Sequence, residues 1–502
     1  MFERLKNLFR KGGAKLGMVA SLTNITDHPK ISVVQEDYDR IQRDLNIYEN
    51  RFKPVEYRGV TGKDWNREYV ALNMKQVAAR RMASIVFNEK AKIEVADKTA
   101  KEFVNGVLSA NDFEKNLEKY LESMFALGGL AIKPYYDSTA KTIKLSWAQA
   151  PTIYPLRSNS NNISDIAIAT RITKSEGKKQ VYYTLLEFHE WRDSKNYTIT
   201  NELYRSEINS MVGIKVPLAT LYPDLQEQSV LKGFSKSMVT YIKPAGFNNL
   251  DITSPLGLAI DSNARSTAKQ INDTYDQFHL EIAFGQRRIA VPDSMLQTLT
   301  DERNGTIKEV FDPKDPVFKQ IPGMNMDDFG IKDLTSDIRA DAYIKSINHF
   351  IKTYEFQTGF SPGTFSFDKD GLKTATEIVS ENSMTYQTRN SQVSQVERGI
   401  REVIVSICEL ASAVGLYHGK IPAMDEITVD FDDGVFVDKN AQADYLIKLF
   451  QAGLTPKYRV LMRINGLDEK SAKAMVAEID DETINSTPTT QEEPPAVDPT
   501  KE

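Results

Sequence analysis

The sequence is nearly free of cysteine. Its one cysteine, Cys408, lies in a mostly apolar run at 403–408 and has no second cysteine for an internal disulfide. A long chain without disulfides is typical of a reducing, intracellular compartment. Because a buried free thiol packs like a small hydrophobic side chain, we expect Cys408 to be a core residue.

Long hydrophobic runs are missing as well. The longest nearly apolar stretch, residues 124–132, is too short to span a bilayer. Residues 1–11 are basic and amphipathic, but they lack the apolar core and cleavage site of a signal peptide. We interpret them as a docking arm or a frayed terminus in preference to a membrane-surface helix, and we expect no membrane partner.

Complete catalytic motifs are also absent. Residues 58–64 resemble a phosphate-binding loop, but Tyr57 replaces its first glycine and Asp64 its magnesium-binding Ser or Thr. Residues 328–330 match the kinase Asp-Phe-Gly tripeptide without the catalytic loop that accompanies it. Residues 430–434 are acidic like a calcium loop, but their glycine comes one place early. We predict no catalytic residue, no cofactor and no metal site, and therefore no enzyme.

The chain has no excess of basic residues. Lys and Arg number 63 against 69 Asp and Glu, which gives a formal net charge of -6. A protein that grips nucleic acid over its whole surface is usually basic. Any contact with DNA is therefore expected to be local or weak. The 502 residues, of which 41% are hydrophobic, allow two to four domains or one large interlocked unit.

The first half of the chain predicts helices followed by strands. One apolar helix face is expected to contain Met74, Val77, Ala78, Met82 and Ile85. A second helix is predicted from Asn111, as its N-cap, to Leu127, before Gly128 and Gly129, and its inward residues are Leu117, Tyr120, Leu121 and Met124. Short strands at 142–147, 163–172, 181–191 and 197–205 are separated by turn clusters. This alternation predicts an antiparallel meander.

The second half predicts two helices around a small α/β unit. Ser254 and Pro255 have the chemistry of an N-cap and first helical residue, and a polar helix is expected to run to Ala283. Strands at 288–291 and 306–311 and a helix at 293–299 follow. A second helix is predicted at 333–358, and then a segment interrupted by Gly and Pro.

A very long helix is predicted from about Thr374 to Leu416. Apolar residues recur every seven positions at Val379, Tyr386, Val393, Ile400, Ile407 and Val414. The companion positions are apolar only in the second half, and residues 380–392 are polar nearly all round. A helix of that kind is expected to bridge solvent or to pack in a wet interface. A strand at 426–431, two short helices and a disordered, proline-containing tail are predicted after it.

This order of elements resembles the stem, clip, stem and tunnel-loop arrangement of phage portal proteins. Several stretches resemble the subgroup from long-tailed phages of Gram-positive bacteria. They are residues 81–89, 126–134, 150–155, 255–258, 360–363, 373–381 and 429–433. The N-terminal arm and the tail lie outside the resemblance.

The resemblance implies an α+β, mainly helical fold of portal-type architecture, with wing, stem, clip and crown regions in a ring-forming oligomer. The implied regions are a wing at 1–254, with a helical part and the β meander, a stem helix at 255–284, a clip at 285–332, a stem helix at 333–358, a tunnel loop at 359–373, a long wing helix at 374–418, a crown at 419–482 and a disordered tail at 483–502.

The implied function is a portal, or head-tail connector, that forms a dodecameric ring at one capsid vertex. Double-stranded DNA would pass through this ring during packaging and ejection. The implied partners are further copies of the chain, the terminase large subunit, the major capsid and scaffolding proteins, and a head-completion or adaptor protein. The expected location is the portal vertex of the virion, after assembly in the host cytoplasm.

The resemblance also nominates site residues. Those of the tunnel loop, toward the DNA channel, are Phe360, Phe365, Phe367, Asp368, Lys369 and Asp370. Which of these side chains face the channel stays open. In the clip, Arg287 and Arg288 are candidates for motor docking, and they are equally suited to ordinary salt bridges. Because each phosphate that is gripped resists sliding, the single basic residue within 360–372, Lys369, fits a conduit.

Three alternatives remain at this point. A helical adaptor or scaffold protein would use the heptad helix to form dimers or trimers. A nucleotide-dependent enzyme would use residues 59–64. A head-tail adaptor ring is a further alternative, but such proteins are usually much shorter than 502 residues.

Overall fold

The structure is a computed structural model. It describes residues 21–58, 64–87, 91–159, 162–193, 196–285, 289–292, 318–321, 332–333, 337–366, 383–431, 439–465, 467 and 469–485. The predicted helix at 293–299, the predicted strand at 306–311 and the tripeptide at 328–330 lie outside these residues, as do most of the loop at 58–64 and of the acidic turn at 430–434.

The chain divides into two compact units. The first comprises residues 1–369 and 384–432, and the second comprises 370–383 and 433–502. The described part combines helices and sheets with more residues in helices, as predicted. No helix in this described part is long and apolar enough to cross a membrane.

The first unit begins with a helical layer. Its helices are α2 (Gln35–Tyr48), α3 (Met74–Val86), α4 (Lys98–Ala110) and α5 (Phe113–Leu127). Helix α3 packs on α5, and Met74, Ala78, Met82 and Ile85 are buried as predicted. Val77 was predicted wrongly, because the buried face of α3 is centred on Ala78 and Met82 and leaves Val77 40% exposed.

Helix α5 also buries its predicted face, with one correction at its start. Leu117, Leu121 and Met124 are fully buried. Tyr120 lies at the edge of this buried face, where its ring stacks on that of Trp147. Asn111 does not cap α5; it ends α4, and its side-chain amide donates to carbonyl oxygens of α4 and β5. The predicted stop at Gly128 is confirmed by a left-handed φ of 91°.

The predicted meander is confirmed. Strands β6 (Ile153–Asn159), β7 (Asn162–Glu176), β8 (Lys179–Trp191), β9 (Asn196–Ser206) and β10 (Ile214–Val216) pair antiparallel in sequence order, and β11 (Gln228–Lys232) pairs with β9 beside β10. The strand predicted at 142–147 is not part of it. It forms β5 (Thr142–Gln149) in a second sheet with β4 (Leu130–Asp137) and β12 (Thr240–Ile242), because the short turn after β4 pairs the two strands as a hairpin.

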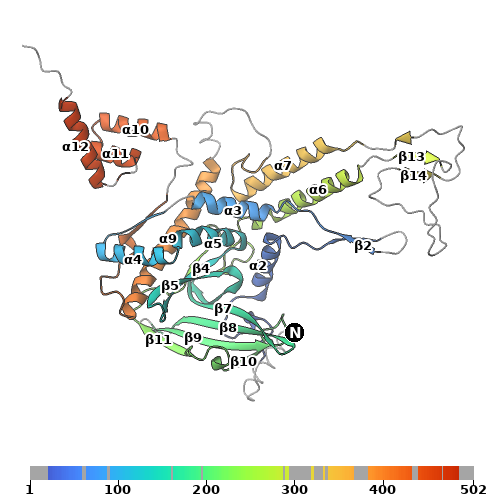
Figure 1. The fold of residues 1–502 in the computed structure, drawn as a ribbon, viewed down its shortest axis with the longest axis horizontal. Coiled ribbons are helices and arrows are strands. Elements are labelled where there is room, and N and C mark those ends of the chain that lie inside the picture. Colours follow the sequence, from blue (N-terminus) through green and yellow to red (C-terminus); the bar gives the residue numbers. More distant parts are fainter. Residues whose placement is uncertain are drawn as a thin grey trace, which may run out of the picture. The chain divides into compact units, whose positions relative to one another are not determined.

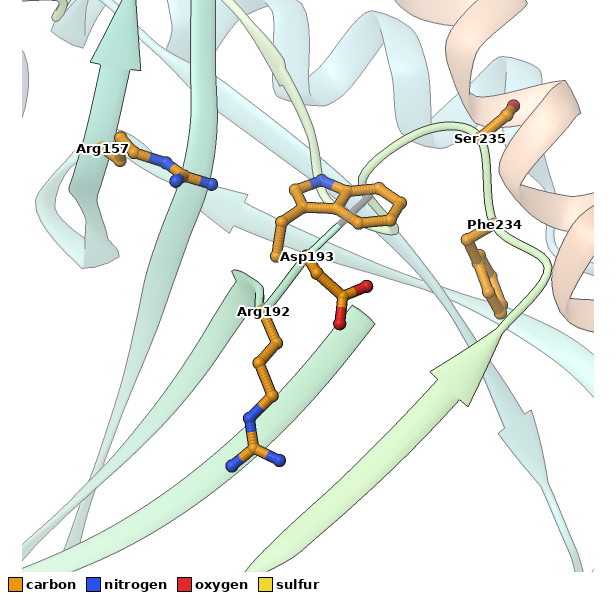
Figure 2. A pocket seen from close by; sticks show the side chains of 6 residues that line it. Arg157, Arg192, Asp193, Phe234 and Ser235 are labelled. Atoms are coloured by element: carbon orange, nitrogen blue, oxygen red, sulfur yellow. The ribbon is translucent and has the colours of Figure 1, made fainter. Parts of the chain in front are cut away.

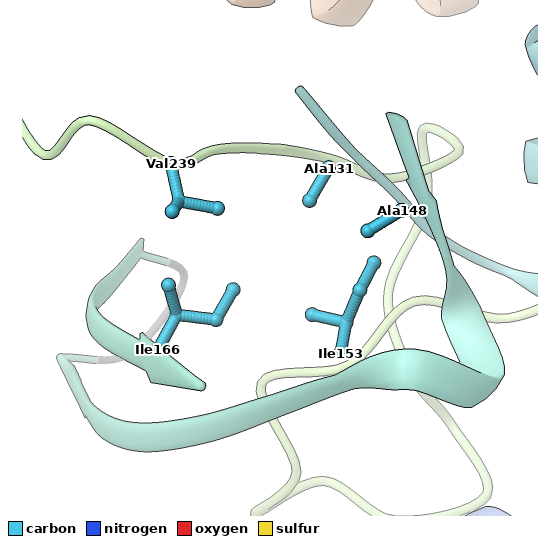
Figure 3. Packing of buried hydrophobic residues seen from close by; sticks show 5 residues of the cluster. All are labelled: Ala131, Ala148, Ile153, Ile166 and Val239. Atoms are coloured by element: carbon cyan, nitrogen blue, oxygen red, sulfur yellow. The ribbon is translucent and has the colours of Figure 1, made fainter. Parts of the chain in front are cut away.

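The two sheets share a small apolar core (Figure 3). Ala131 and Ala148 come from β4 and β5, Ile153 and Ile166 come from β6 and β7, and Val239 precedes β12. The two alanines leave room for the larger isoleucine side chains, which are 0% and 2% exposed. Burial of each such side chain stabilises the fold by about 1.5–3 kcal/mol.

Three smaller sheets complete the first unit. Strands β1 (Val55–Arg58) and β2 (Asp64–Arg67) form a hairpin, and β3 (Lys92–Val95) pairs with β16 (Ile427–Asp430). Strand β13 (Ile289–Pro292), predicted at 288–291, pairs in parallel with β14 (Phe318–Ile321) and antiparallel with β15 (Lys332–Asp333). Short 3-10 helices lie at Ile25–Asp27 (η1), Ala150–Thr152 (η2), Leu218–Thr220 (η3), Ser262–Ala264 (η4) and Met424–Glu426 (η6).

The two helices around β13–β15 start later than predicted. Helix α6 spans Arg265–Phe284 and does not begin at Ser254. The chain before it is held by long-range contacts: Gly257 lies against the backbone of Gly128, and the Ile260 amide donates to the Phe125 carbonyl at 2.9 Å. Helix α7 spans Ala340–Thr358, because Lys332–Asp333 is used by β15 instead.

Helix α9 (Ser383–Ala413) buries most of its predicted apolar half. Val396, Ile400, Val403, Ile407 and Leu410 are buried, as predicted. The predicted end at Leu416 was wrong, because α9 ends at Ala413 ahead of the left-handed Gly415, and Val414 is 36% exposed. Cys408 is a core residue as expected, and burial raises the pKa of its thiol to about 12. In the polar half, Arg389 and Gln392 are buried inside the unit, where Arg389 Nε donates to the Ile85 carbonyl at 2.7 Å. One face of the polar half is therefore hydrogen-bonded within the chain, whereas Gln387, Asn390 and Ser391 are exposed, as the sequence predicts for a solvated helix. Residues 374–382 lie outside the described residues.

The second unit contains three helices within residues 439–485, where two were predicted. They are α10 (Lys439–Gln451), α11 (Lys457–Asn465) and α12 (Glu469–Asn485). Helix α11 contacts both others, and Leu446, Val460 and Ala472 are buried, one from each helix. Helix α12 extends to Asn485, past the predicted start of the tail at 483, and residues 486–502 are not described.

Candidate functional site

Helices α6 and α7 form an antiparallel pair that carries the β13–β15 sheet between them in sequence (Figure 1). At one end, the Thr267 hydroxyl donates to Gln357 at 2.8 Å. Farther along, the rings of Phe278 and Tyr343 stack with centroids 5.2 Å apart. These contacts hold the two helices side by side over most of their length.

A salt bridge joins α6 to the residue before α7 at the end of the two helices near β13 and β15. The Arg339 guanidinium donates to both carboxylate oxygens of Glu281, at 2.9 and 2.7 Å. These hydrogen bonds lower the pKa of Glu281 to about 2. The two-pronged geometry is the strong form of an Arg–carboxylate contact.

The pair also presents large apolar side chains to solvent. Phe356 is 69% exposed and Ile282 is 49% exposed, and Ile338 and Ile344 are similarly open. Phe356 lies at the end of the pair where Thr267 meets Gln357, whereas Ile282 and Ile338 lie at the other end, beside the Glu281–Arg339 contact. The exposed apolar groups are therefore distributed along the pair.

The root of α6 is fixed by buried charges. Lys75, which is 3% exposed, lies between Asp261 and Asp44, and its Nζ is 3.2 Å from the Asp44 carboxylate. Arg265 reaches the same Asp44 carboxylate at 3.3 Å. These residues come from α2, α3, the turn before α6 and α6 itself. Because removal of one partner leaves a buried charge uncompensated, the cluster ties these elements together.

Residues 67–72, which we call the strap and which begin at the last residue of β2, are also attached to α6. Both terminal nitrogens of Arg67 donate to Asp276, at 2.6 and 2.5 Å. The Tyr69 hydroxyl donates to Asp273 at 2.7 Å, and the amide of Leu72 donates to Asn272. Polar residues that made α6 look solvated in the sequence are therefore bound to the strap.

The loop after α7 is anchored at its base. Gly359 ends α7 with a left-handed φ of 78°. The buried Glu355 carboxylate accepts hydrogen bonds from the amides of Gly363 and Phe365, at 2.9 and 2.5 Å. The Ser361 amide donates to the Thr385 hydroxyl at 2.7 Å, which joins the loop to α9. Residues 359–366 are thus held between two helices.

Two of the predicted tunnel-loop residues lie in this anchored part. Phe360 is fully buried, and its ring packs edge-on against Phe365, with centroids 4.8 Å apart. Phe365 is partly exposed. The other predicted site residues lie outside the described residues. They are Phe367, Asp368, Lys369, Asp370, Arg287 and Arg288.

Sequence reasoning missed the anchors of this loop. Glu355 occupies a position between the buried Ile351 and Thr358 on one face of α7. A carboxylate on the buried face of a helix indicates a specific hydrogen-bond partner, since burial of an unpaired charge is costly. The position of Glu355 on that face could be read from the sequence. Its partners, the amides of Gly363 and Phe365, could not.

One cavity of about 470 Å³ opens at the edge of the meander (Figure 2). It is lined by Arg157, Trp191, Arg192, Asp193, Phe234 and Ser235. The Ser235 hydroxyl donates to the Glu409 carboxylate at 2.5 Å, and burial raises the pKa of that carboxyl. Activation of a serine nucleophile needs an adjacent general base such as histidine. The lining of this cavity contains no histidine, and Ser235 is instead hydrogen-bonded to Glu409, whose carboxyl has a raised pKa.

The described residues also hold no grouping suited to a metal ion, that is, no cluster of three or more His, Cys, Asp or Glu. His189 is fully buried in the meander, and burial lowers its pKa. Its ring nitrogens contact Glu187 at 2.5 Å and the Tyr197 hydroxyl at 3.0 Å, so it serves a core hydrogen-bond network.

Comparisons with known proteins give one family and several distant structures. The profile of the family described as phage portal protein, SPP1 Gp6-like, matches residues 27–488. A search of curated proteins gives no match. A chain from the neck of an empty GTA particle, computed with C6 symmetry, is 10% identical with a TM-score of 0.42, and 83% of this chain and 96% of that chain are covered.

Two further solved structures are similarly distant. A chain from the neck of a native GTA particle, computed with C12 symmetry, is 9% identical with a TM-score of 0.39, over 77% of this chain and 88% of that one. A chain from the virion of a native gene transfer agent particle is 10% identical with a TM-score of 0.40, over 78% and 89%. Similarity at this level decides nothing about assembly.

The family match is of a different kind, because it extends over most of the sequence. It runs from residue 27 to residue 488 and so includes every helix from α2 to α12, the anchored loop and all the sheets. The resemblance found in the sequence is confirmed, and the chain belongs to the SPP1 Gp6-like family of phage portal proteins.

Proposed function

We propose that copies of this chain form a dodecameric ring at one capsid vertex, through which double-stranded DNA passes during packaging and ejection. The observation that carries the proposal is the α6–α7 pair, which leaves apolar side chains such as Phe356 and Ile282 exposed along its length, in a chain of the portal family. Helices with open apolar surfaces gain stability when further copies cover them.

The regions of such a ring follow the structural boundaries. The stem consists of α6 and α7, the clip lies between them at 285–339, and the wing contains α2–α5, the meander and α9. The tunnel loop begins at Gly359 and ends before α9, and the crown consists of α10–α12. In this proposal the stem starts at Arg265 and Ala340, later than the starts of 255 and 333 that the resemblance implies, because the two helices start there.

The tunnel loop is proposed to guide DNA without gripping it. Phe360 is buried, so it serves as an anchor and offers no surface to DNA, whereas Phe365 marks the point where the loop leaves the anchored base. Lys369 is the one basic residue within 360–372 and stands between Asp368 and Asp370, and Lys373 is the one further basic residue before α9. Weak net attraction for phosphates keeps sliding friction low.

The proposed partners divide by region. Arg287 and Arg288 in the clip are proposed to contact the terminase large subunit, and a head-completion or adaptor protein would later close the exit. The wing and crown would contact the major capsid and scaffolding proteins. The ring would assemble in the host cytoplasm and remain at the portal vertex of the virion. Its role is structural, without chemistry of its own.

Mass photometry of the native assembly, with negative-stain images of the same sample, tests this proposal. We expect particles near twelve times 56.7 kDa with a central hole. Rings of thirteen would also support it, because the same interfaces close both. A uniform dimer or trimer without rings, even in added salt or divalent cations, would contradict it and support the adaptor alternative.

The adaptor alternative has lost its main support in the sequence. It required the heptad residues of α9 to pair between chains. Ile400 and Ile407 are 0% exposed within a single chain, so this seam is already occupied. Small oligomers would therefore need another contact surface.

A further inference from the structure

The segment between β12 and α6 presents three large apolar side chains to solvent. Phe247 is 67% exposed, Leu250 is 54% exposed and Ile252 is 73% exposed. They fall within six consecutive positions. We refer to residues 245–254 as the apolar loop. A single exposed aliphatic residue needs no explanation, but three together on one loop are typical of a contact site.

Internal hydrogen bonds hold the apolar loop in one conformation. The buried Asn248 side chain accepts from the amides of Leu250 and Asp251, at 3.2 and 3.1 Å, and donates to the Leu256 carbonyl at 3.0 Å. Asp251 accepts from the amide and hydroxyl of Thr253. The exposed side chains are therefore carried on a fixed backbone, which lowers the entropy lost when a partner binds.

Further hydrogen bonds join the apolar loop to three separate helical elements. The Ala245 amide donates to Gln392 of α9 at 2.7 Å. Asn249 donates to Asn263 of η4 at 3.0 Å. The Ser254 hydroxyl donates to Asp37 of α2 at 2.8 Å. These three attachments hold the backbone of the apolar loop against the neighbouring helical elements.

Charge narrows the choice of partner. Asp251 is the one ionisable side chain in residues 245–254, and its carboxylate is already engaged by Thr253. Interfaces between permanent partners are more apolar than those of transient ones, which use charge to steer association. An apolar and nearly uncharged loop thus fits a permanent partner.

We propose that the apolar loop is part of the interface between neighbouring copies of this chain, with Phe247, Leu250 and Ile252 inserted against the next copy. The inference rests on the proposed ring. In a closed ring each copy uses two different surfaces, so a projecting surface on one copy meets a receiving surface on the next. A second copy is also the permanent partner that is present wherever this chain is made.

The test compares two triple variants of the full chain. One carries Phe247→Ser, Leu250→Ser and Ile252→Ser. The matched control carries Ile208→Ser, Ile214→Ser and Val230→Ser, whose parent side chains are 54%, 44% and 46% exposed around the meander. Mass photometry over a dilution series gives the concentration at which each assembly dissociates, and circular dichroism with thermal unfolding checks that each subunit is folded.

We expect the apolar-loop variant to dissociate at a concentration at least tenfold higher than the parent, while the control dissociates like the parent. Unchanged dissociation of a folded apolar-loop variant would overturn the inference. If the triple variant does not fold, the single change Ile252→Ser is measured in the same way.

The outcomes also separate this inference from the proposed ring. If the parent forms a small oligomer instead of a ring, and the apolar-loop variant dissociates that oligomer, the contact is supported and the ring is not. If the parent forms rings that the variant leaves intact, the ring stands and the contact fails. A parent that is monomeric at every concentration overturns both.

Discussion

Two glycines show how much depends on single residues. A Cβ at Gly257 would lie 2.3 Å from the backbone oxygen of Gly128 and 2.7 Å from Lys243. No side chain fits there without movement of the backbone. The approach of these two segments also explains why residues 255–261 do not join α6.

Gly257→Ala is therefore expected to destabilise the protein by about 1–3 kcal/mol, since overpacking displaces neighbouring groups. Gly106→Ala is the matched control. Gly106 lies inside α4 with open space around its Cα, and alanine should stabilise that helix by about 0.5–1 kcal/mol. Thermal or urea unfolding of both variants measures the difference, and equal effects would contradict this view of Gly257.

At the scale of the element, the α6–α7 pair should respond to acid through Glu281. The pKa of this carboxyl is about 2 in the folded chain and near its ordinary value of 4.5 when unfolded. A lowered carboxyl pKa contributes stability above the unfolded value, and the contribution is lost as the pH falls toward 2.

The parent should accordingly lose more stability between pH 5 and pH 3 than Arg339→Gln, which lacks the ion pair from the start. Melting temperatures of both proteins at the two pH values provide the measurement. Other carboxylates titrate in the same window, so the comparison depends on the difference between parent and variant. An identical loss in both would mean that the pair contributes nothing.

The attachment of α6 to α2 and α3 depends on Lys75. Lys75→Met leaves Asp44 and Asp261 buried without this cation, and we expect a loss of about 3–5 kcal/mol. Lys98→Met provides the control, because its contact with Glu102 is largely exposed and such pairs contribute about 0–1 kcal/mol. Chemical denaturation measures both, and similar losses would refute a special role for the buried cluster.

Helices and strands could be predicted where the local sequence pattern favours the same structure as the packing of the folded chain. The face of α5 with Leu117 and Leu121, the stop at Gly128 and strands β7–β9 follow from periodicity and turn chemistry alone. The start of α6 does not, because the capping chemistry of Ser254 and Pro255 is overridden by contacts with a segment more than a hundred residues away.

The candidate site was predictable to a smaller degree, for the same physical reason. The Gly and Pro residues around Phe360 predicted a loop at this place. The hydrogen bonds that anchor this loop and the helix after it, however, join parts of the chain that are distant in sequence. Arg389 donates to the carbonyl of Ile85, and Thr385 pairs with Ser361. A polar helix face gives no indication of whether its partner is water, another copy or its own chain.

For the whole molecule, the exposed apolar groups on α6 and α7 are expected to matter only after copies of the chain assemble. Phe356→Ser is expected to leave the melting temperature of the isolated subunit within about 1–2 °C, since a surface change away from special features alters stability little. It should weaken the ring, so that assemblies dissociate at higher concentration than the parent.

Size-exclusion chromatography with light scattering, performed at several protein concentrations, checks this prediction. Val230→Ser is a suitable control, because it removes an exposed apolar side chain from the meander. Rings of equal persistence in both variants would show that the outer surface of the α6–α7 pair is not covered by a neighbouring copy.

The pairing of β3 with β16 has a consequence for synthesis of the chain. Residues 92–95 find their strand partner only at residues 427–430. Until the ribosome has released that distant segment, β3 remains an open edge, and such edges promote association with other unfinished chains. At about 5–20 residues per second, the wait lasts roughly 17–70 seconds. Chains that stop before residue 427 never close this edge, and quality control in the host would meet them as aggregation-prone fragments.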